Sequence, residues 1–334
     1  MGKYLKLFSK LSEYQDFINS SEYIEPNVTL ITGSKSLYYN NKLSSSDGMG
    51  EIESFIMEYL SFELIDNSMI SFGNTENTIQ YSLDKEQWDE LAVDERISVT
   101  AGKTIYFKAS NPSIGEEYGI GTFSSTGRFN VKGNIMSMLY GDNFDNQVDL
   151  TGKKACFNRL FTSCTTLVDA SKMVLPATSL SEYAYYGLFQ FCTSLTSAPK
   201  LPATALTTGC YYMMFQGCTS LVNAPELPAT TLASSCYTGM FQGCTNLKST
   251  PALPATTLSS YCYYLMFHSC SNLNNITMLA TDISATDCLR EWVRDVAPTG
   301  TFYRNPEMTS LPIGIDGIPE GWKVEGITGN DILL

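Results

Sequence analysis

Hydrophobic and small residues recur at a fixed spacing through the middle of the chain. A Phe-x-x-Cys motif occurs five times, spaced by 28 residues once and by 26 residues thereafter. A leucine lies three positions after each cysteine, and an LPAT tetrapeptide follows, degraded to LATD in the last copy. The motifs are Phe161/Cys164, Phe189/Cys192, Phe215/Cys218, Phe241/Cys244 and Phe267/Cys270. Repeats of this length predict a solenoid in which each unit buries its apolar face against its neighbours.

The spacing within each repeat predicts a short helix. Thr230 is a suitable N-cap, and Leu232, Cys236 and Met240 fall at i, i+4 and i+8, on one face of a helix over residues 231–241. The following CTNLKSTPAL segment is expected to turn and extend into a strand. Proline lies inside that extended part in three repeats, so the strand should be short or interrupted.

The flanks predict other structures. Short alternating runs between residues 62 and 110, broken by Gly, Asn and Asp, favour a small antiparallel β-domain. Within it, YSLDKEQWDEL predicts a strand, a turn and a second strand led by Trp88. Residues 10–23 are compatible with a helix, and the Gly-rich segment 116–150 is expected to cap the first repeat.

These patterns predict an α+β fold, in which a small N-terminal β-rich domain precedes a solenoid with terminal caps. Five regions are expected: an N-terminal attachment or oligomerisation module (1–50), a small antiparallel β-domain (51–115), an N-terminal cap (116–155), a solenoid of five units (156–283) and a C-terminal cap (284–334).

Charge excludes some classes of partner. The chain has 334 residues with 21 Lys and Arg against 34 Asp and Glu, a net charge of −13. An acidic chain without a basic cluster is a poor candidate for binding nucleic acid or anionic lipid. No stretch approaches the roughly 18 apolar residues of a membrane helix, so we expect no membrane insertion. The N-terminus lacks an apolar core and a cleavage site, so we expect no export signal.

The ten cysteines fall into two columns when the repeats are aligned. One column is the Phe-x-x-Cys cysteine, and the other lies eight residues earlier, where Ala184 replaces cysteine in one repeat. Tolerance of alanine indicates a small, buried, apolar position. Neighbouring units would bring cysteines of one column close enough for a disulfide, but reduced packing cysteines are the preferred interpretation.

The sequence gives little support for catalysis. The nearest cysteines are eight residues apart, which does not match the close pairs of zinc sites. The one histidine, His268, aligns with Gln216 and Gln242 and is interpreted as a polar residue on a turn. A Cys270–His268 dyad is the weaker alternative. We therefore expect a non-enzymatic protein without cofactor or metal.

Two rows of residues are candidates for a binding surface. Tyr185, Tyr211, Tyr237 and Tyr263 form a column expected to pack between units. The next column tolerates Thr238 and Asn158, which suggests exposure, and its tyrosines could stack on sugars or contact a protein. The strand side offers variable polar positions, and the two faces cannot be ranked. The candidate residues are Tyr186, Tyr212, Tyr264, Ser197, Lys200, Asn223 and Glu226.

The repeat unit F-x-G-C-T-S-L-x-x-A-P-x-L-P-A-T-x-L resembles the BspA-type leucine-rich repeat proteins of gut Bacteroidetes. The segments YSLDKEQW, GKTIYFKASN and GTFSSTGRFNVKGNIMSMLYGDNF resemble the flanks of such repeats, and the resemblance covers about residues 55–330. It implies a leucine-rich-repeat-like solenoid and adhesion to proteins or glycans. The segment LSEYQDFINSSEYIEPNVTLITGSKSLYYN is similar to the N-terminal module of structural proteins from phages of the same bacteria.

Two functional hypotheses result. The first is a virion fibre or decoration protein that is made in the host cytoplasm. It would attach to other virion proteins through residues 1–50, form a homo-oligomer and bind a host-surface glycan or protein. The alternative is a BspA-like adhesin on the bacterial cell surface, whose export signal is missing from this sequence.

Overall fold

The computed structural model describes residues 28–31, 36–39, 42–45, 58–73, 79–93, 95–109 and 121–327. The chain divides into two compact units, Met1–Glu58 and Tyr59–Leu334. The first contains an antiparallel sheet of strands β1 (Val28–Ile31), β2 (Ser36–Tyr39) and β3 (Lys42–Ser45), in that order. The helix predicted over residues 10–23 lies outside the described residues.

The second unit begins with antiparallel β-structure, as the alternating runs predicted. Strand β4 pairs with β9, β5 pairs with β8, and β6 pairs with both β7 and β9, all antiparallel. The β6–β7 hairpin is the predicted strand, turn and strand led by Trp88. The strands are β4 (Leu60–Leu64), β5 (Ser68–Gly73), β6 (Ile79–Ser82), β7 (Asp89–Leu91), β8 (Arg96–Val99) and β9 (Thr104–Lys108).

One sheet joins this β-structure to the repeats. Strand β10 (Thr122–Ser125) pairs with β5, while β11 (Phe129–Asn134) pairs antiparallel with β4 and parallel with β12 (Leu167–Val174). The six-stranded order is therefore β12-β11-β4-β9-β6-β7. Helix α2 (Ser137–Tyr140) and the 3-10 helix η2 (Gly141–Asn143) follow β11. The first repeat is thus anchored through backbone hydrogen bonds.

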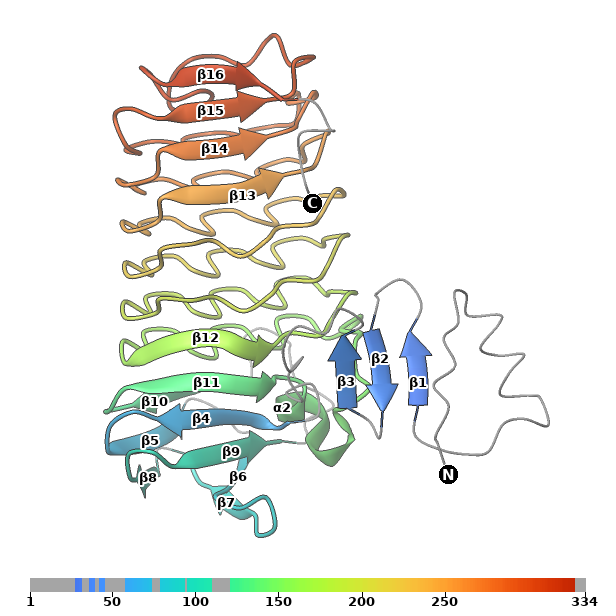
Figure 1. Ribbon diagram of the computed structural model, residues 1–334, viewed down its shortest axis with the longest axis vertical. Helices are drawn as coiled ribbons and strands as arrows, with labels where there is room; N and C mark the ends of the chain where they lie inside the picture. The colour runs from blue at the N-terminus through green and yellow to red at the C-terminus, as the bar shows by residue number, and fades with distance from the viewer. Residues whose placement is uncertain are drawn as a thin grey trace, which may run out of the picture. The chain divides into compact units, whose positions relative to one another are not determined.

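The repeats stack on one another, and each forms one circuit of chain that we call a rung (Figure 1). Strands β13 (Ser249–Leu253), β14 (Asn275–Met278), β15 (Thr301–Arg304) and β16 (Lys323–Gly326) form a parallel sheet across successive rungs. The rungs between β12 and β13 are linked on this side by single parallel bridges, Asp169–Ser197 and Asn223–Ser249. Pro251 falls at a register shift inside β13, so the expected interruption by proline is confirmed.

The predicted α+β class, with a leucine-rich-repeat-like solenoid, is wrong. The described residues are almost entirely strand, turn and irregular backbone, and the four-residue α2 is the one α-helix among them. The helix predicted over residues 231–241 is absent, and the corresponding segment of each rung consists of consecutive turns. The structure is therefore almost all β.

A regular backbone pattern explains the missing helix. In the segment from Tyr183 to Phe191, every fourth residue has a positive φ, with values of 56° at Tyr183, 58° at Gly187 and 60° at Phe191. The same pattern occurs in five other rungs, and we call these segments the turn ribbons. They span residues 155–163, 183–191, 209–217, 235–243, 261–269 and 287–295. A left-handed residue interrupts helical hydrogen bonding, so a period of four residues produces turns here.

Hydrogen bonds within the turn ribbon alternate between local and inter-rung partners. The Tyr211 amide donates to the Cys236 carbonyl of the next rung at 3.1 Å, whereas the Met214 amide donates to the Tyr211 carbonyl of its own rung at 3.2 Å. The alternation satisfies backbone groups without helix or regular strand. In the rung of residues 209–217, for example, Tyr211, Met214 and Phe215 are buried, whereas Tyr212 and Met213 are partly exposed.

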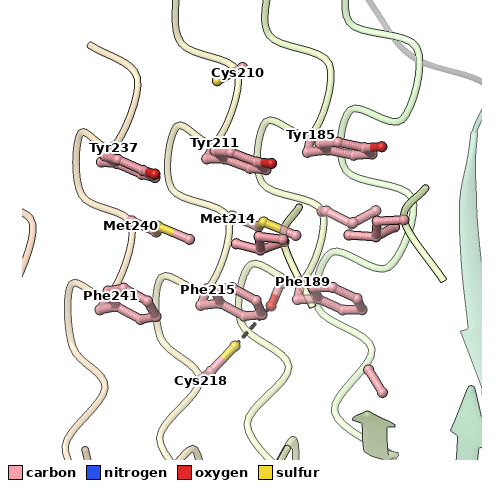
Figure 2. Packing of buried hydrophobic residues seen from close by; sticks show 14 of the residues in the cluster. Tyr185, Phe189, Cys210, Tyr211, Met214, Phe215, Cys218, Tyr237, Met240 and Phe241 are labelled. Atoms are coloured by element: carbon pink, nitrogen blue, oxygen red, sulfur yellow. Dashed lines mark hydrogen bonds between the residues drawn. The ribbon is translucent and has the colours of Figure 1, made fainter. Parts of the chain in front are cut away.

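Two stacked aromatic columns fill the core of the repeats (Figure 2). Tyr185 stacks on Tyr211 at 5.7 Å between ring centroids, and Phe189 stacks on Phe215 at 5.5 Å. The tyrosine column runs from Phe157 to Tyr263, and the phenylalanine column from Phe161 to Phe267. The prediction that the first of these columns packs between units is confirmed.

The columns are closed at both ends by other aromatic residues. Phe161 lies 5.7 Å from Phe123 of β10 and 5.9 Å from Phe62 of β4, measured between ring centroids. At the other end, Trp292 covers Tyr263 and Phe267, and its Nε1 donates to the Gly317 carbonyl at 2.8 Å. The outward face of the turn ribbon is therefore held by a continuous buried core.

Candidate binding face of the turn ribbon

The tyrosines predicted as a candidate surface form a row on the outward side of the turn ribbon. Tyr186, Tyr212 and Tyr264 are all partly exposed. The rings of Tyr186 and Tyr212 meet edge to face with 5.2 Å between centroids. We call these three residues the tyrosine row.

The rung between Tyr212 and Tyr264 lacks a tyrosine at the corresponding position. Thr238 occupies the corresponding position and is 1% exposed, and its hydroxyl donates to the Tyr261 carbonyl at 2.6 Å. Partial burial raises the pKa of Tyr212, with smaller contributions from Tyr186 and Tyr264. The rung of Thr238 therefore contributes no aromatic ring to the row. The exposure expected for this column holds in part for its tyrosines, whereas Thr238 and Asn158 themselves are buried.

An arginine lies at each end of the tyrosine row. The Arg159 guanidinium carbon is 5.0 Å from the Tyr186 ring centroid, and its Nη2 donates to the Tyr186 hydroxyl at 2.9 Å. The Arg290 guanidinium carbon is 5.8 Å from the Tyr264 ring centroid. Such cation–π contacts fix ring orientation and stabilise an exposed pair by about 0.5–1 kcal/mol. Sequence reasoning missed both arginines, although the alignment of the repeats shows them: Arg290 stands in the same column as Tyr264, and Arg159 follows the first position of that column.

A ladder of amide side chains runs parallel to the tyrosine row. The Gln190 Nε2 donates to the Gln216 Oε1, and the Gln216 Nε2 donates to the Gln242 Oε1. His268 continues this column, and its Nδ1 lies 3.1 Å from the Ser269 hydroxyl oxygen. The ladder orients each amide group, since each link fixes one donor and one acceptor. The interpretation of His268 as a polar residue on a turn agrees with this placement.

The strand-side candidates lie on a different part of each rung. Ser197 bridges to Asp169 and Asn223 bridges to Ser249, whereas Lys200 and Glu226 are exposed. Among the described residues, no ring contact or side-chain hydrogen bond joins these four residues to the tyrosine row. The candidate residues therefore form two separate surfaces.

The cysteines are packing residues, as Ala184 suggested. All ten are buried free thiols. The Cys218 thiol donates to the Phe189 carbonyl of the preceding rung at 3.1 Å, and Cys192, Cys244 and Cys270 repeat this contact (Figure 2). Burial raises the pKa of Cys270 to about 12, so its thiol is held away from the nucleophilic thiolate form.

The described residues offer no other recognised chemical site. No group of three or more His, Cys, Asp or Glu side chains in these ranges is arranged to hold a metal ion. Within the same ranges, no helix has the length and hydrophobicity that crossing a bilayer requires. Comparison with protein-family models, with curated proteins and with solved structures gives no match. The tyrosine row is therefore the best-defined candidate site.

Proposed function

We propose that this chain is a non-enzymatic structural protein of a virion, a fibre or decoration protein, that adheres to a host-surface glycan or protein. The observation that carries the proposal is the tyrosine row, a set of partly exposed aromatic side chains held on a stacked core. Tyrosine is well suited to binding surfaces, because one ring supplies apolar area and a hydroxyl group with little conformational entropy to lose.

The resemblance of the repeats to BspA-type proteins supports adhesion, and the resemblance of the N-terminal segment to phage structural proteins supports the virion location. In this proposal residues 1–50 attach the protein to other virion proteins, and the protein acts as a homo-oligomer. Mass spectrometry of purified phage particles tests the location. Detection in bacterial outer membranes, with no detection in particles, would favour the cell-surface adhesin instead.

Adhesion is tested by binding of the purified full chain to intact host cells, with one variant for each candidate surface. Tyr186→Ala, Tyr212→Ala and Tyr264→Ala combined remove the tyrosine row. The matched variant combines alanine at Ser197, Lys200, Asn223 and Glu226 on the strand side.

We expect the tyrosine variant to lose at least tenfold in binding and the strand-side variant to keep it. Far-ultraviolet circular dichroism of both variants checks that they remain folded. Loss in the strand-side variant alone would overturn the assignment to the tyrosine row, and binding by both variants would overturn adhesion through either surface.

A further inference from the structure

The outward face around the tyrosine row carries no charge over four consecutive rungs. The segments 183–192, 209–218, 235–244 and 261–270 contain no Asp, Glu, Lys or Arg. The turn ribbons on either side of these four contain charged residues. They include Arg159 in the rung before and Asp287, Arg290 and Glu291 in the rung after. A charged ligand laid along this face would lose hydration without gaining a partner of opposite charge, so the face favours an uncharged ligand.

On the same face, large side chains of one rung pack over glycines of the next rung. Tyr183 lies directly over Gly209, because a Cβ at that glycine would overlap its ring. Phe191 lies over Gly217 in the same way, with a Cβ there 2.5 Å from the Phe191 Cδ1, and Met213 lies over Gly239 at 3.2 Å. Large side chains thus spread along the stack axis, and the glycine of the next rung accommodates them. The large side chains of one rung thus lie over the backbone of the next, which gives successive rungs a joint outward surface along the stack axis.

The spacing of the rungs gives this face a repeat along its length. Tyr186 and Tyr212 are 5.2 Å apart between centroids, and the buried rings of successive rungs lie 5.5 to 6.1 Å apart. One pyranose ring of an extended polysaccharide has a comparable length. From Tyr186 to Tyr264 there are three rung steps, roughly 15 Å in all. A ligand lying along the stack axis would therefore meet a tyrosine of the row on the first, second and fourth of these rungs.

We propose that the tyrosine row binds a linear, uncharged polysaccharide that lies along the stack axis with about one sugar ring on each rung. This inference rests on the proposed adhesive function and assigns its ligand. The rings of the row contact the apolar faces of the sugars, and the tyrosine hydroxyls hydrogen-bond to sugar hydroxyls. Arg159 and Arg290 mark the two ends of the site.

Calorimetry of the full chain with β-1,4-linked gluco- and manno-oligosaccharides, from disaccharide to octasaccharide, tests this inference. Oligogalacturonates of matched length serve as the anionic probes. We expect affinity to rise with length up to about four sugars, one for each rung from Tyr186 to Tyr264, and then to level off. We also expect the anionic series to bind at least tenfold more weakly. Equal binding of the two series, or no dependence on length, would overturn the proposal.

Three variants connect binding to the tyrosine row. Tyr212→Ala should weaken binding of the hexasaccharide about tenfold, and Tyr212→Phe should keep most of it, because the aromatic face is retained. Tyr303→Ala, on β15 outside the row, is the matched control and should bind normally. An unchanged affinity of Tyr212→Ala would contradict the assignment. Light scattering gives a second test. A dimer that Tyr212→Ala dissociates would also contradict the assignment, because the row would then be a contact between copies of the chain.

The cell-binding assay separates failure of this inference from failure of the proposed function. If cell binding requires the tyrosine row but no neutral oligosaccharide binds, adhesion is upheld and the polysaccharide ligand is rejected. If cell binding requires the strand side and not the row, adhesion is upheld and the present inference is rejected; if neither variant loses cell binding, both proposals are rejected.

Discussion

Most left-handed positions of the turn ribbons carry a residue other than glycine. Met213, Leu265 and Tyr261 all have φ between 52° and 57°. Each such residue costs about 1–2 kcal/mol relative to the right-handed region. The strain is tolerated because inter-rung hydrogen bonds and the stacked core hold the backbone in place. The other left-handed positions carry glycine. At some of them a Cβ would also contact a side chain of the preceding rung, so steric overlap as well as the positive φ favours glycine there.

Gly217 and Gly243 allow these two effects to be separated. Their φ values are 73° and 74°, but a Cβ at Gly217 would meet Phe191, whereas one at Gly243 has no neighbour closer than 3.8 Å. Gly243→Ala should lower the free energy of unfolding by about 1–2 kcal/mol, and Gly217→Ala by about 1–3 kcal/mol more. Urea unfolding measures both.

Adding Phe191→Ala to Gly217→Ala should recover most of the extra loss, because it removes the overlapping ring. Equal effects of the two single glycine substitutions would show that Phe191 does not overlap position 217.

The buried thiols predict sensitivity to alkali. Burial raises the pKa of Cys210 and Cys262 to about 12 from an ordinary value of 9.0. A group with a raised pKa in the folded state stabilises the fold fully below its unfolded pKa, and this contribution is lost as pH rises toward the folded value. The urea concentration at the midpoint of unfolding should therefore decrease as the pH rises from 9 to about 12.

Cys210→Ala should reduce this decrease in the urea midpoint, because it removes one titrating thiol. Alanine should fit the site, since Ala184 occupies the equivalent position. A midpoint that stays constant above pH 9 would contradict the role assigned to burial.

At the scale of the element, the tyrosine column contains an unsatisfied polar group in at least two rungs. The hydroxyls of Tyr185 and Tyr211 are buried and have no hydrogen-bond partner. An unpaired buried hydroxyl costs about 1–3 kcal/mol. Tyr211→Phe should therefore keep the ring stack and raise the free energy of unfolding by about 1 kcal/mol.

Phe157 already shows that phenylalanine fits this column, with its ring stacked on Tyr185 at 5.7 Å. Tyr211→Ala is the contrasting variant and should cost about 3–5 kcal/mol, as expected for loss of a buried ring. A loss of stability in Tyr211→Phe would indicate that the hydroxyl has a partner, such as a buried water molecule.

The sequence predicted the repeat, the upstream antiparallel strands, the packing columns of tyrosine and cysteine and the interruption at Pro251. It failed for the turn ribbon, because Leu232, Cys236 and Met240 recur every four residues, close to the helical period of 3.6. The distinguishing feature is a left-handed residue at every fourth position, and bulky residues such as Met213 conceal it. The arginine ends of the tyrosine row depend on contacts between rungs, which the pattern of one repeat does not reveal.

At the scale of the whole molecule, equivalent rungs should be removable one at a time. Deleting residues 210–235 removes one repeat and joins Gly209 to Cys236, which keeps every column in register. We expect a folded protein with the same far-ultraviolet spectrum and a moderately lower thermal midpoint, because stability in such stacks is nearly additive over units.

Deleting residues 210–222 is the control, since it removes half a repeat and breaks the register. It should give an unfolded or aggregated protein. If both deletions unfold the chain, the rungs are not equivalent, and the middle of the stack has a specific role.

The direction of the inter-rung hydrogen bonds has a mechanical consequence. Bonds such as Tyr211 to Cys236 lie along the stack axis, so tension applied between the two ends of the stack loads successive rungs in series. Rungs then detach one after another rather than all together. Each releases 26 residues, about 90 Å of slack. If the chain is an adhesive tether, as proposed above, each such step would lengthen the tether and so limit the force that builds up on the adhesive contact.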